Sequence, residues 1–363
     1  MALSMAHAAP LAPLTTLQLG GAAEFLAEIG DPADLAAALA WAQARGCPVT
    51  VLGGGSNVLV ADRGVAGLVI RMVSRGIVEV EGSGTLSIRA AAGECWDDVV
   101  ALAVARGAAG IECLSGIPGS VGATPIQNVG AYGQEVAQVV TRVRVHDRTC
   151  GEIVWMSRED CEFGYRTSVF KREPQRYVVL EVEYALRLGG QVAIRYAELA
   201  RAVGPDPSIA SVRDTVLALR ASKSMLVDPA DENHRSVGSF FTNPIVSAVQ
   251  ADAVREQARS GGLDTEVPSW PQPDGRVKLA AAWLIEHSGT RKGERHGAVG
   301  VSTRHSLALV HHGGGTTSAL LELADMIAAR VSTRFGIRLA LEPVLIGGDR
   351  RRSVTAARQP NAR

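Results

Sequence analysis

Glycine and amide residues between Leu114 and Gly133 have the types and spacing best suited to chemistry, and the stretch reads LSGIPGSVGATPIQNVGAYG. Gly116, Gly119 and Gly122 recur at every third position, and two prolines stiffen the path between them. Glycine lets a backbone approach a ligand closely, and successive N–H groups in such turns form a nest that holds an anion. The stretch therefore predicts a loop for a diphosphate, in preference to a glycine-rich loop that only packs tightly.

Two further groups could serve the same ligand. Gln127 and Asn128 provide an amide pair that can donate and accept hydrogen bonds beside a polar ring. The segment from Gly53 to Asn57 reads GGGSN. A dinucleotide fingerprint would need a third spaced glycine and then a helix, whereas residues 58–60 read as a strand. We interpret the segment as a strand–loop–strand element whose N–H groups can also face a phosphate, although the motif alone is not specific.

Composition excludes several classes of function. Lys plus Arg and Asp plus Glu number 37 each, so the chain lacks the basic footprint of a nucleic-acid-binding protein. No apolar run is long enough to span a membrane, and the first residues do not read as a signal peptide. The five cysteines are odd in number and include no C-x-x-C, which argues against a disulfide framework and a metal site. We expect a cytoplasmic protein.

Lysine is rare in this chain although arginine is common. The four lysines are Lys171, Lys223, Lys278 and Lys292. A preference for arginine across a genome explains the trend but does not explain the exceptions. A site that needs a compact ammonium, which arginine cannot supply, is one reason to retain lysine. Chance is an equal alternative for any one of them.

The spacing of apolar and turn residues predicts an α+β fold, because strands outnumber the helices that could connect parallel strands. Asp31 and Pro32 are typical of a helix start, and Gly336 is typical of a helix end. The expected helices cover 32–45, 94–106, a segment that opens with a capping box at 211–214, 278–287 and 318–335. The expected strands cover 49–52, 58–60, 68–70, 86–90, 141–146, 152–155, 177–188, 307–310 and 339–346.

Five motifs occur in an order that resembles the UDP-N-acetylenolpyruvoylglucosamine reductase (MurB) family, in its longer subtype with a tyrosine-bearing loop. The similarity spans about residues 15–348. The motifs are GGGSN at 53–57, GIPGSVGATPIQNVGAYG at 116–133, FGYRTSVFK at 163–171, GSFFTNP at 238–244 and LALEPVLIG at 339–347.

This resemblance implies both an architecture and a reaction. It implies a vanillyl-alcohol-oxidase-type (PCMH-type) FAD-binding domain at 17–190 and a smaller α+β substrate-binding domain at 191–348, with disordered tails at 1–16 and 349–363. It also implies non-covalent FAD, NADPH and the substrate UDP-N-acetylglucosamine enolpyruvate. The product would be UDP-N-acetylmuramate, a precursor of peptidoglycan and hence of cell shape and division. We expect a monomer.

The resemblance also assigns residues to the cofactor. They belong to the two glycine-rich stretches described above and to the GAYG sequence that ends the second. The expected cofactor-binding residues are Gly53, Gly54, Gly55, Ser56, Asn57, Gly116, Ile117, Pro118, Gly119, Ser120, Gly122, Gln127, Asn128, Gly130, Ala131 and Tyr132.

Three residues are expected to be catalytic. Arg166 would donate two hydrogen bonds to the substrate carboxylate as negative charge develops there; the alternative is a surface ion pair. Glu342 would help if its carboxyl is protonated, since desolvation can keep such a group neutral; the alternative is a solvated side chain. Ser239 would give the proton that follows hydride transfer; the alternative is a turn serine. Phe240 and Phe241 would hold its turn still.

Five further residues are candidates for substrate binding. They are Tyr165, Tyr196, Lys223, Asn243 and Lys292.

Two positions depart from the family pattern. Thr242 stands where some members carry Lys, and Pro343 follows Glu342 where many carry Val. The proline could change the register of Glu342. His311 and His312 are adjacent on an expected strand, so their side chains face opposite ways, and we interpret them as structural or solvated.

Two other functions remain alternatives. One is a different FAD-dependent oxidoreductase of the vanillyl-alcohol-oxidase type, which would often tether its flavin through His or Cys; the glycine loops have neither beside their glycines. The other is a flavin-binding module without catalysis, which would not need the ordered Arg, Ser and Glu set. Fold alone cannot separate these functions.

Overall fold

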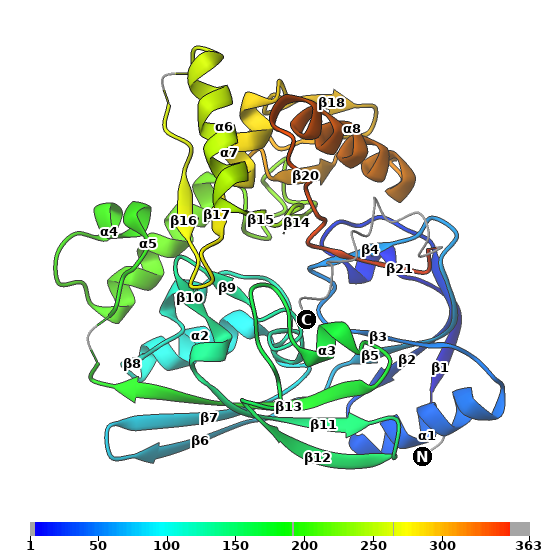
Figure 1. Cartoon of the computed structure of the whole chain (residues 1–363). Helices are drawn as coiled ribbons and strands as arrows, with labels where there is room; N and C mark the ends of the chain where they lie inside the picture. The colour runs from blue at the N-terminus through cyan, green and yellow to red at the C-terminus, as the bar shows by residue number, and fades with distance from the viewer. Residues whose placement is uncertain (1–3, 191, 264, 349–363) are drawn as a thin grey trace. The chain divides into compact units, whose positions relative to one another are not determined.

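The computed structural model of this chain describes residues 4–190, 192–263 and 265–348 (Figure 1). These residues form two compact units. Unit 1 contains residues 4–10, 22–55 and 65–227, and unit 2 contains residues 11–21, 56–64 and 228–348. The expected tail at 349–363 and residues 1–3 lie outside the described residues. Among the described residues, no helix is long and apolar enough to cross a membrane.

The first sheet of unit 1 has the strand order β1-β2-β5-β3. Strands β2 and β3 pair with β5 in parallel, whereas β1 and β2 are antiparallel. Helix α1 covers Pro32–Ala44, and the Asp31 carboxylate accepts the Ala33 N–H at 2.7 Å, as expected of its N-cap. The strands are β1 (Met5–Pro10), β2 (Ala22–Ile29), β3 (Val49–Leu52) and β5 (Val65–Met72).

The prediction that residues 1–16 are unordered is corrected for the part that the structure describes. Residues Met5–Pro10 are strand β1, and Ala12–Leu14 is a short 3-10 turn. The Ala/Pro-rich composition hid this strand because pairing at a sheet edge uses the backbone and needs no apolar alternation. Pro10 is tolerated because it ends an edge strand.

The second sheet of unit 1 is antiparallel, in the order β12-β11-β13-β7-β6, and β8 also pairs with β13. The expected hairpin of β11 and β12 is present. Trp96 and Tyr184 are among the largest fully buried side chains of this unit, with ring centroids 5.6 Å apart. The strands are β6 (Ile77–Gly82), β7 (Thr85–Ala91), β8 (Ala108–Ala109), β11 (Val140–Asp147), β12 (Glu152–Ser157) and β13 (Tyr177–Leu188).

The described residues of unit 1 also form the helices α2 (Trp96–Ala105), α3 (Val169–Arg172), α4 (Ala197–Val203) and α5 (Ile209–Ser222). Two expectations are corrected here. The N-cap of α5 is Ser208, whose hydroxyl accepts the Ser211 N–H, so the helix begins before the expected capping box. Helices α4 and α5 also pack in unit 1, so the expected boundary at residue 190 falls inside that unit.

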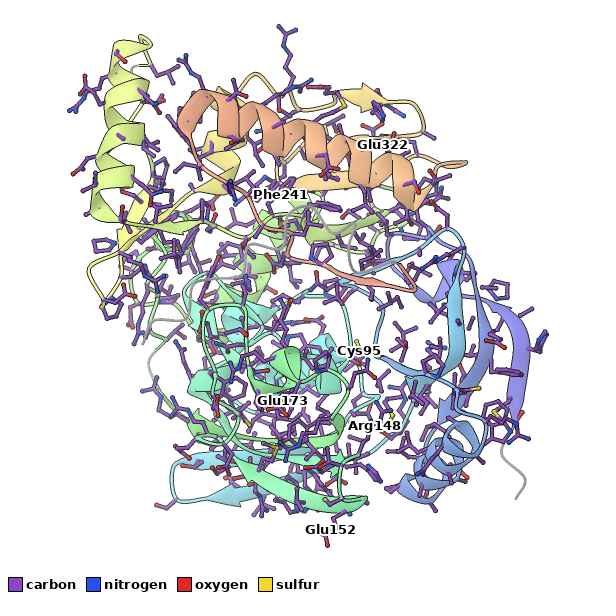
Figure 2. All side chains as sticks on the ribbon, turned by 45° about the vertical axis from the view of Figure 1, so that its right-hand side comes forward. Cys95, Arg148, Glu152, Glu173, Phe241 and Glu322 are labelled. Carbon is purple, nitrogen blue, oxygen red and sulfur yellow. The ribbon has the colours of Figure 1, made fainter. Side chains whose placement is uncertain are left out.

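Unit 2 contains an antiparallel sheet in the order β14-β20-β19-β18, a second sheet in the order β15-β17-β16, and the parallel pair β4 and β21. Its core includes Phe240, Phe241, Trp283 and Phe335, and Figure 2 shows Phe241 among the packed side chains. The strands are β4 (Val58–Val60), β14 (Ser236–Ser239), β15 (Ile245–Val246), β16 (Ser269–Pro271), β17 (Val277–Leu279), β18 (Arg295–His296), β19 (Val299–Val301), β20 (Ala308–His311) and β21 (Val344–Ile346).

The helices of unit 2 are α6 (Ala248–Ser260), α7 (Ala281–His287) and α8 (Thr317–Phe335). The expected helix at 278–287 is shorter than predicted, because Lys278 lies in strand β17 and pairs with Ile245 and Trp270. The expected strand at 339–346 is also shorter: β21 begins at Val344, while Leu341 makes an isolated bridge to Phe241.

Candidate functional site

The two glycine-rich loops meet in unit 1. The Gly54 N–H donates to the Ser120 hydroxyl at 3.1 Å, although the residues are 66 positions apart. A Cβ atom added to Gly54 would lie 2.6 Å from Gly119 Cα, and one added to Gly53 would lie 2.9 Å from Ser120 Oγ. Side chains at these positions would force the loops apart. The glycines therefore create one joined backbone surface, and Gly54 is exposed on it.

The regular glycine spacing has more than one physical cause. Gly116 has φ +70 and Gly119 has φ +126, conformations that favour glycine. Gly122 is needed for packing, because a Cβ there would lie 2.6 Å from Ala92 Cβ. The Gly116 N–H already donates to Asp97 Oδ1 at 2.6 Å. The anion-binding surface is therefore expected to use other N–H groups of the loop.

Asn128 shapes this region from inside the protein. Its side-chain amide donates to Glu135 Oε2 at 2.8 Å and to the Gly164 carbonyl at 3.1 Å, and its carbonyl accepts the Ala137 N–H at 3.0 Å. The residue is buried and has φ +49. A direct contact between its amide and a cofactor therefore stays a prediction. Gln127, the other half of the expected amide pair, is half-buried in the preceding turn.

Tyr132 lies in a tight hairpin between β9 (Gly130–Ala131) and β10 (Gln134–Glu135). Tyr132 and Gly133 both have positive φ, as the type I′ turn requires. The Tyr132 ring is perpendicular to that of Tyr196 with centroids 5.5 Å apart, and Lys223 Nζ is 5.8 Å from its centroid. The structure therefore brings together three predicted site residues.

Charge and burial distinguish the members of this cluster. Lys223 Nζ donates to Glu198 Oε2 at 2.6 Å, so the ammonium has a carboxylate partner within unit 1. Burial raises the pKa of the Tyr132 phenol to about 12, and burial also raises the pKa of Tyr196. Both phenols therefore remain neutral hydrogen-bond donors near pH 7.

Arg166 occupies the third position of a turn closed by paired backbone bonds between Gly164 and Thr167. Its φ is +54, a conformation that a non-glycine residue adopts at a cost of roughly 1 kcal/mol or more. Its guanidinium donates to the Gly130 carbonyl at 2.7 Å and lies 5.7 Å from the centroid of the Tyr165 ring. The turn thus fixes Arg166 and Tyr165 beside the β9–β10 hairpin.

Ser239 and Glu342 lie on neighbouring extended segments of unit 2. The Glu342 N–H donates to the Phe240 carbonyl at 3.0 Å, and the Thr242 N–H donates to the Ala340 carbonyl at 3.0 Å. Ser239 ends β14 and pairs with Ala308. Glu342 is buried, with 8% of its surface exposed. These backbone contacts place Glu342 beside Phe240, the residue that follows Ser239.

Pro343 does not disturb the backbone contact of Glu342. After Glu342 the chain leaves Phe240, and the Val344 N–H donates to the Asn57 carbonyl at 3.0 Å. The Asn57 side chain also donates to the Glu342 carbonyl at 3.4 Å. Pro343 thus stands where the segment changes partners. Its missing N–H removes no bond from either pairing.

Asn243, Lys292 and His311 have contacts of their own in unit 2. Asn243 Oδ1 accepts the Ala281 N–H at 2.9 Å, at the start of α7. Lys292 is exposed and pairs with Glu286 at 3.3 Å. His311 is buried between the Leu17 carbonyl and the Gly315 N–H, as expected of a structural histidine. Roles for Asn243 and Lys292 toward a substrate stay predictions.

Comparison with known proteins decides the family. Residues 228–346 match the family model for the UDP-N-acetylenolpyruvoylglucosamine reductase C-terminal domain, and residues 23–157 match that of an FAD binding domain. The chain is 47% identical over 348 residues to UDP-N-acetylenolpyruvoylglucosamine reductase of Streptomyces avermitilis, covering 94% of each chain. It is 48% identical over 354 residues to that of Thermobifida fusca, covering 96% of this chain and 99% of the relative.

The chain belongs to the UDP-N-acetylenolpyruvoylglucosamine reductase family. A solved structure of MurB from Thermus caldophilus has a TM-score of 0.64 at 25% identity, covering 95% of this chain and 99% of its own. The expected resemblance is therefore confirmed, and so is the expected order of an FAD-binding domain followed by a smaller α+β domain. FAD and NADPH are the cofactors of this family.

The glycine surface fits the FAD of the family. Gly54 and Gly119 approach so closely that a Cβ on Gly54 would overlap Gly119. The N–H groups of Gly54, Gly116 and Gly122 already donate within the protein, so a phosphate would be held by other N–H groups of the loops, which the absence of side chains lets it approach closely. This close approach of two backbones suits a bound FAD, and the individual cofactor contacts stay predictions.

Four residues near the site were missed by sequence reasoning. The backbone of Cys95 pairs with that of Ser120, and the residue is exposed. Cys95 is labelled in Figure 2. A cysteine therefore lies beside the glycine loop in the fold, although none adjoins the glycines along the chain. Asp97, Lys171 and Arg213 also contact predicted site residues or their partners. The rarity of lysine was a signal for Lys171, whereas the other three had none.

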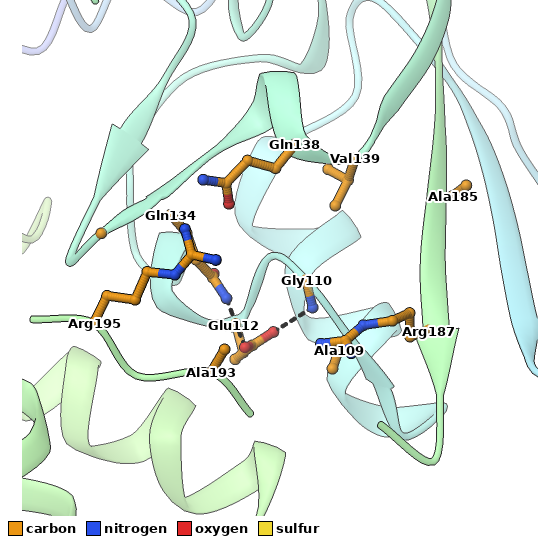
Figure 3. A pocket seen from close by; sticks show the side chains of 11 residues that line it. Ala109, Gly110, Glu112, Gln134, Gln138, Val139, Ala185, Arg187, Ala193 and Arg195 are labelled. Atoms are coloured by element: carbon orange, nitrogen blue, oxygen red, sulfur yellow. Dashed lines mark hydrogen bonds between the residues drawn. The ribbon is translucent and has the colours of Figure 1, made fainter. Parts of the chain in front are cut away.

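A cavity of about 190 Å³ lies elsewhere in unit 1, between β13, the β9–β10 region and the segment before α4 (Figure 3). None of the predicted site residues lines it. Its buried Glu112 carboxylate accepts the Gly110 N–H at 2.6 Å and the Gln134 amide at 2.6 Å. Because these polar groups satisfy one another, we assign Glu112 a structural role.

Proposed function

We propose that this chain is an FAD-dependent enzyme that uses NADPH to reduce UDP-N-acetylglucosamine enolpyruvate to UDP-N-acetylmuramate, a step of peptidoglycan precursor synthesis. The observation that carries this function is the match to reductases of this name over at least 94% of the chain. The joined glycine surface and the Ser239–Glu342 arrangement support it.

FAD, when bound, would carry two electrons from NADPH to the enolpyruvyl double bond. The loops at Gly53–Gly55 and Gly116–Gly122 would hold its diphosphate through backbone N–H groups, because anions bind well to such nests. Tyr132 would line the same site with a neutral phenol. The protein would thereby supply position and electrostatics, while the redox chemistry belongs to the cofactor.

Arg166 is proposed to stabilise charge on the substrate carboxylate. Hydride addition to the enolpyruvyl carbon pushes electrons onto that carboxylate, and a guanidinium can meet it with parallel N–H bonds. The turn and the bond to the Gly130 carbonyl restrict the side chain. Such restriction supports catalysis more than the surface ion pair that is the usual alternative for an arginine.

Ser239 is proposed to give the proton to the neighbouring carbon, and Glu342 is proposed to assist as the neutral acid. Among the described residues, no hydrogen bond engages the Ser239 hydroxyl, which is therefore not occupied as a turn cap. Glu342 is buried, and burial favours the protonated form of a carboxyl group that has no cation beside it. A neutral acid would not oppose the negative charge that develops on the substrate.

Substrate binding is proposed for Tyr165, Tyr196, Lys223, Asn243 and Lys292. Lys223 is the best supported, because its ammonium sits with Tyr132 and Tyr196 in one cluster. The segment at 192–227 would then contribute substrate ligands while it packs in unit 1. We place the boundary of the substrate domain that forms unit 2 at residue 228 rather than 191.

The cellular setting is also part of the proposal. We place the enzyme in the cytoplasm as a monomer, acting on small molecules rather than on nucleic acid or membrane. Five free cysteines and equal numbers of acidic and basic residues agree with this setting. Through peptidoglycan, the reaction would support cell shape and cell division.

The test of the proposed function is NADPH consumption that depends on added UDP-N-acetylglucosamine enolpyruvate. An oxidase of the same flavin fold would consume oxygen with a small alcohol, and a flavin-binding module would show neither activity. Cys95 adjoins Ser120 of the glycine loop, and related oxidases often tether their flavin through Cys. Acid precipitation of the protein should therefore accompany the assay, to test whether the flavin is covalently bound. Yellow supernatant and colourless pellet would establish non-covalent flavin, whereas flavin retained in the pellet would contradict it.

A further inference from the structure

Asp97 lies on helix α2 and links this helix to the glycine loop by a hydrogen bond. Its Oδ1 atom accepts the Gly116 N–H at 2.6 Å. Arg213 of helix α5 donates Nη1–H to the same oxygen at 2.8 Å and Nη2–H to Oδ2 at 2.7 Å. One carboxylate therefore joins the first glycine of the loop to a helix that follows it by about a hundred residues.

The Asp97–Arg213 pair is partly shielded from water. The side chain of Arg213 is 16% exposed and that of Asp97 is 30% exposed. Burial acts to raise the pKa of Asp97, but the hydrogen bonds from Arg213 and Gly116 outweigh it and hold the pKa below its usual range. Asp97 is therefore an anion at neutral pH, and a bidentate arginine is a strong partner for it.

Helix α5 also packs directly under the loop. A Cβ on Gly116 would lie 2.6 Å from Leu226 Cδ2 and 2.8 Å from Leu217 Cδ2. The same Cβ would be 3.4 Å from Nε of the buried Arg220. The position and the charge of the loop therefore depend on residues 213–226, which lie beyond the matched FAD-binding segment at 23–157.

This arrangement presents an electrostatic conflict that Arg213 resolves. A carboxylate is a good acceptor for the Gly116 N–H, yet an unpaired carboxylate would repel a diphosphate held by the same loop. The bidentate guanidinium neutralises Asp97 without taking away its bond to Gly116. An uncharged donor could fill the space but could not cancel the charge.

We propose that Arg213 is a positioning residue for the FAD-diphosphate loop, which it holds through Asp97 while it neutralises the charge of that carboxylate. The inference rests on the proposed function in one respect, the assignment of the loop at 116–122 to FAD. In this proposal Arg213 acts through Asp97 rather than on the reacting atoms. Its effect is on how tightly the cofactor is retained.

The test measures FAD release from purified holoprotein after dilution, followed by the fluorescence of free flavin. Arg213→Gln should release FAD roughly 10-fold faster than the unchanged protein, because Asp97 loses its bidentate charge partner and keeps only the Gly116 N–H and the charge of Arg220, which does not bond to it. Arg213→Lys should stay within a few-fold of the unchanged protein, because it keeps the charge. Arg71→Gln is the matched control, since it breaks an ion pair with Glu28 between β5 and β2 of the same unit.

The double variant Asp97→Asn/Arg213→Gln separates neutralisation from ordinary packing. Neutralisation predicts that it releases FAD more slowly than Arg213→Gln, because the repelling charge is gone. It also predicts that added salt slows release from Arg213→Gln and has little effect on the double variant. Release from the double variant at least as fast as from Arg213→Gln, or unchanged release from Arg213→Gln, would overturn the proposal.

Failure of this proposal can be told from failure of the proposed function. The function fails when the unchanged holoprotein does not consume NADPH in response to the enolpyruvyl UDP-sugar, whatever Arg213 does. The positioning role fails when that activity is present and the release rates do not follow the predicted order.

Discussion

The Lys171 ammonium donates a hydrogen bond to the main-chain carbonyl of Arg166, 3.1 Å away. That carbonyl belongs to a residue with φ +54, a conformation that needs support from its surroundings. Asn128 supports the other side of the same turn by donating to the Gly164 carbonyl. The turn that presents Arg166 is therefore held from both ends by side chains.

The bond from Lys171 to the Arg166 carbonyl predicts that Lys171 positions Arg166 for catalysis. Lys171→Met should keep FAD and its reduction by NADPH but slow flavin reoxidation by the enolpyruvyl substrate, by up to ~10²-fold, because a displaced Arg166 stabilises charge less well. Stopped-flow absorbance measures both half-reactions. Arg172→Gln is the control, since that neighbouring cation pairs with Glu162 instead. Equal reoxidation rates in Lys171→Met and the unchanged protein would contradict the role.

The joined glycine loops predict a sharp effect of one methyl group. Gly54→Ala should lower the flavin content of the purified protein, because the new Cβ would lie 2.6 Å from Gly119 Cα and push the loops apart. Gly30→Ala is the matched control, since no atom lies within 4 Å of its added Cβ. The ratio of flavin to protein absorbance measures the content. If Gly54→Ala retained as much flavin as Gly30→Ala, the proposal that these loops bind the cofactor would be wrong.

The sequence predicted the structure correctly where a short motif determines the backbone conformation of its own residues. The Asp31–Pro32 helix start, the β11–β12 hairpin and the glycine positions each follow from the residues at the site itself. It failed where pairing partners decide the structure. Residues 5–10 become a strand because β2 offers an edge. Lys278 becomes part of a strand because β15 and β16 flank it.

The candidate site shows the same division. The proposed cofactor and catalytic residues lie in recognisable motifs, whereas Asp97 and Arg213, which support the glycine loop, do not. Asp97 and Arg213 are 116 positions apart, so no local pattern could join them. The missed helix α6 is different, because its capping box of Ser247 and Gln250 was readable from the sequence.

The proposed role of Lys223 predicts that its loss weakens substrate binding without slowing the reduction of the flavin by NADPH. Lys223→Ala should raise the substrate KM by roughly 10-fold or more, because an ammonium that can neutralise a phosphate or carboxylate is lost. Reduction of the flavin by NADPH should change little. Glu198→Gln is an informative companion, since it removes the carboxylate partner and leaves the ammonium. Slower NADPH reduction with an unchanged KM in Lys223→Ala would show that the assignment is wrong.

His311 predicts a dependence of stability on pH. Burial lowers its pKa below the usual 6.5, the Arg235 charge acts in the same direction, and together they outweigh the bond to the Leu17 carbonyl. Folding therefore favours the neutral ring, whose Nε2 accepts the Gly315 N–H. The unfolded chain binds the proton more readily, so this contribution is complete above pH 6.5 and is lost as the pH falls through the folded pKa.

The measurement is the urea concentration at the unfolding midpoint, compared at pH 7.5 and pH 5. In the unchanged protein, the midpoint urea concentration should be lower at pH 5 than at pH 7.5. His146 and His312 have lowered pKa values and contribute in the same direction. His311→Asn should be less stable at pH 7.5 but lose less on acidification. An equal loss in both proteins would show that His311 is not a source of the dependence.

Ser239 predicts an effect on one proton transfer. Ser239 is half-buried and follows Gly238, which has φ +71. The next two residues are buried phenylalanines whose rings meet edge to face at 70° with centroids 5.6 Å apart. The turn is therefore fixed while the hydroxyl makes no hydrogen bond among the described residues. Such an arrangement suits a group that donates to a ligand.

Ser239→Ala should bind FAD and be reduced by NADPH at the normal rate, but its reduced flavin should be reoxidised by the enolpyruvyl substrate ~10²–10⁴-fold more slowly. Ser239→Cys, which keeps a proton on a side chain of similar size, should recover part of this loss. A turn-capping serine would instead lower stability by about 1 kcal/mol and leave reoxidation nearly unchanged. Ser236→Ala provides that comparison, because the Ser236 hydroxyl accepts the Gly238 N–H in the same strand. Stopped-flow reoxidation of Ser239→Ala at the rate of Ser236→Ala would exclude Ser239 as the proton donor.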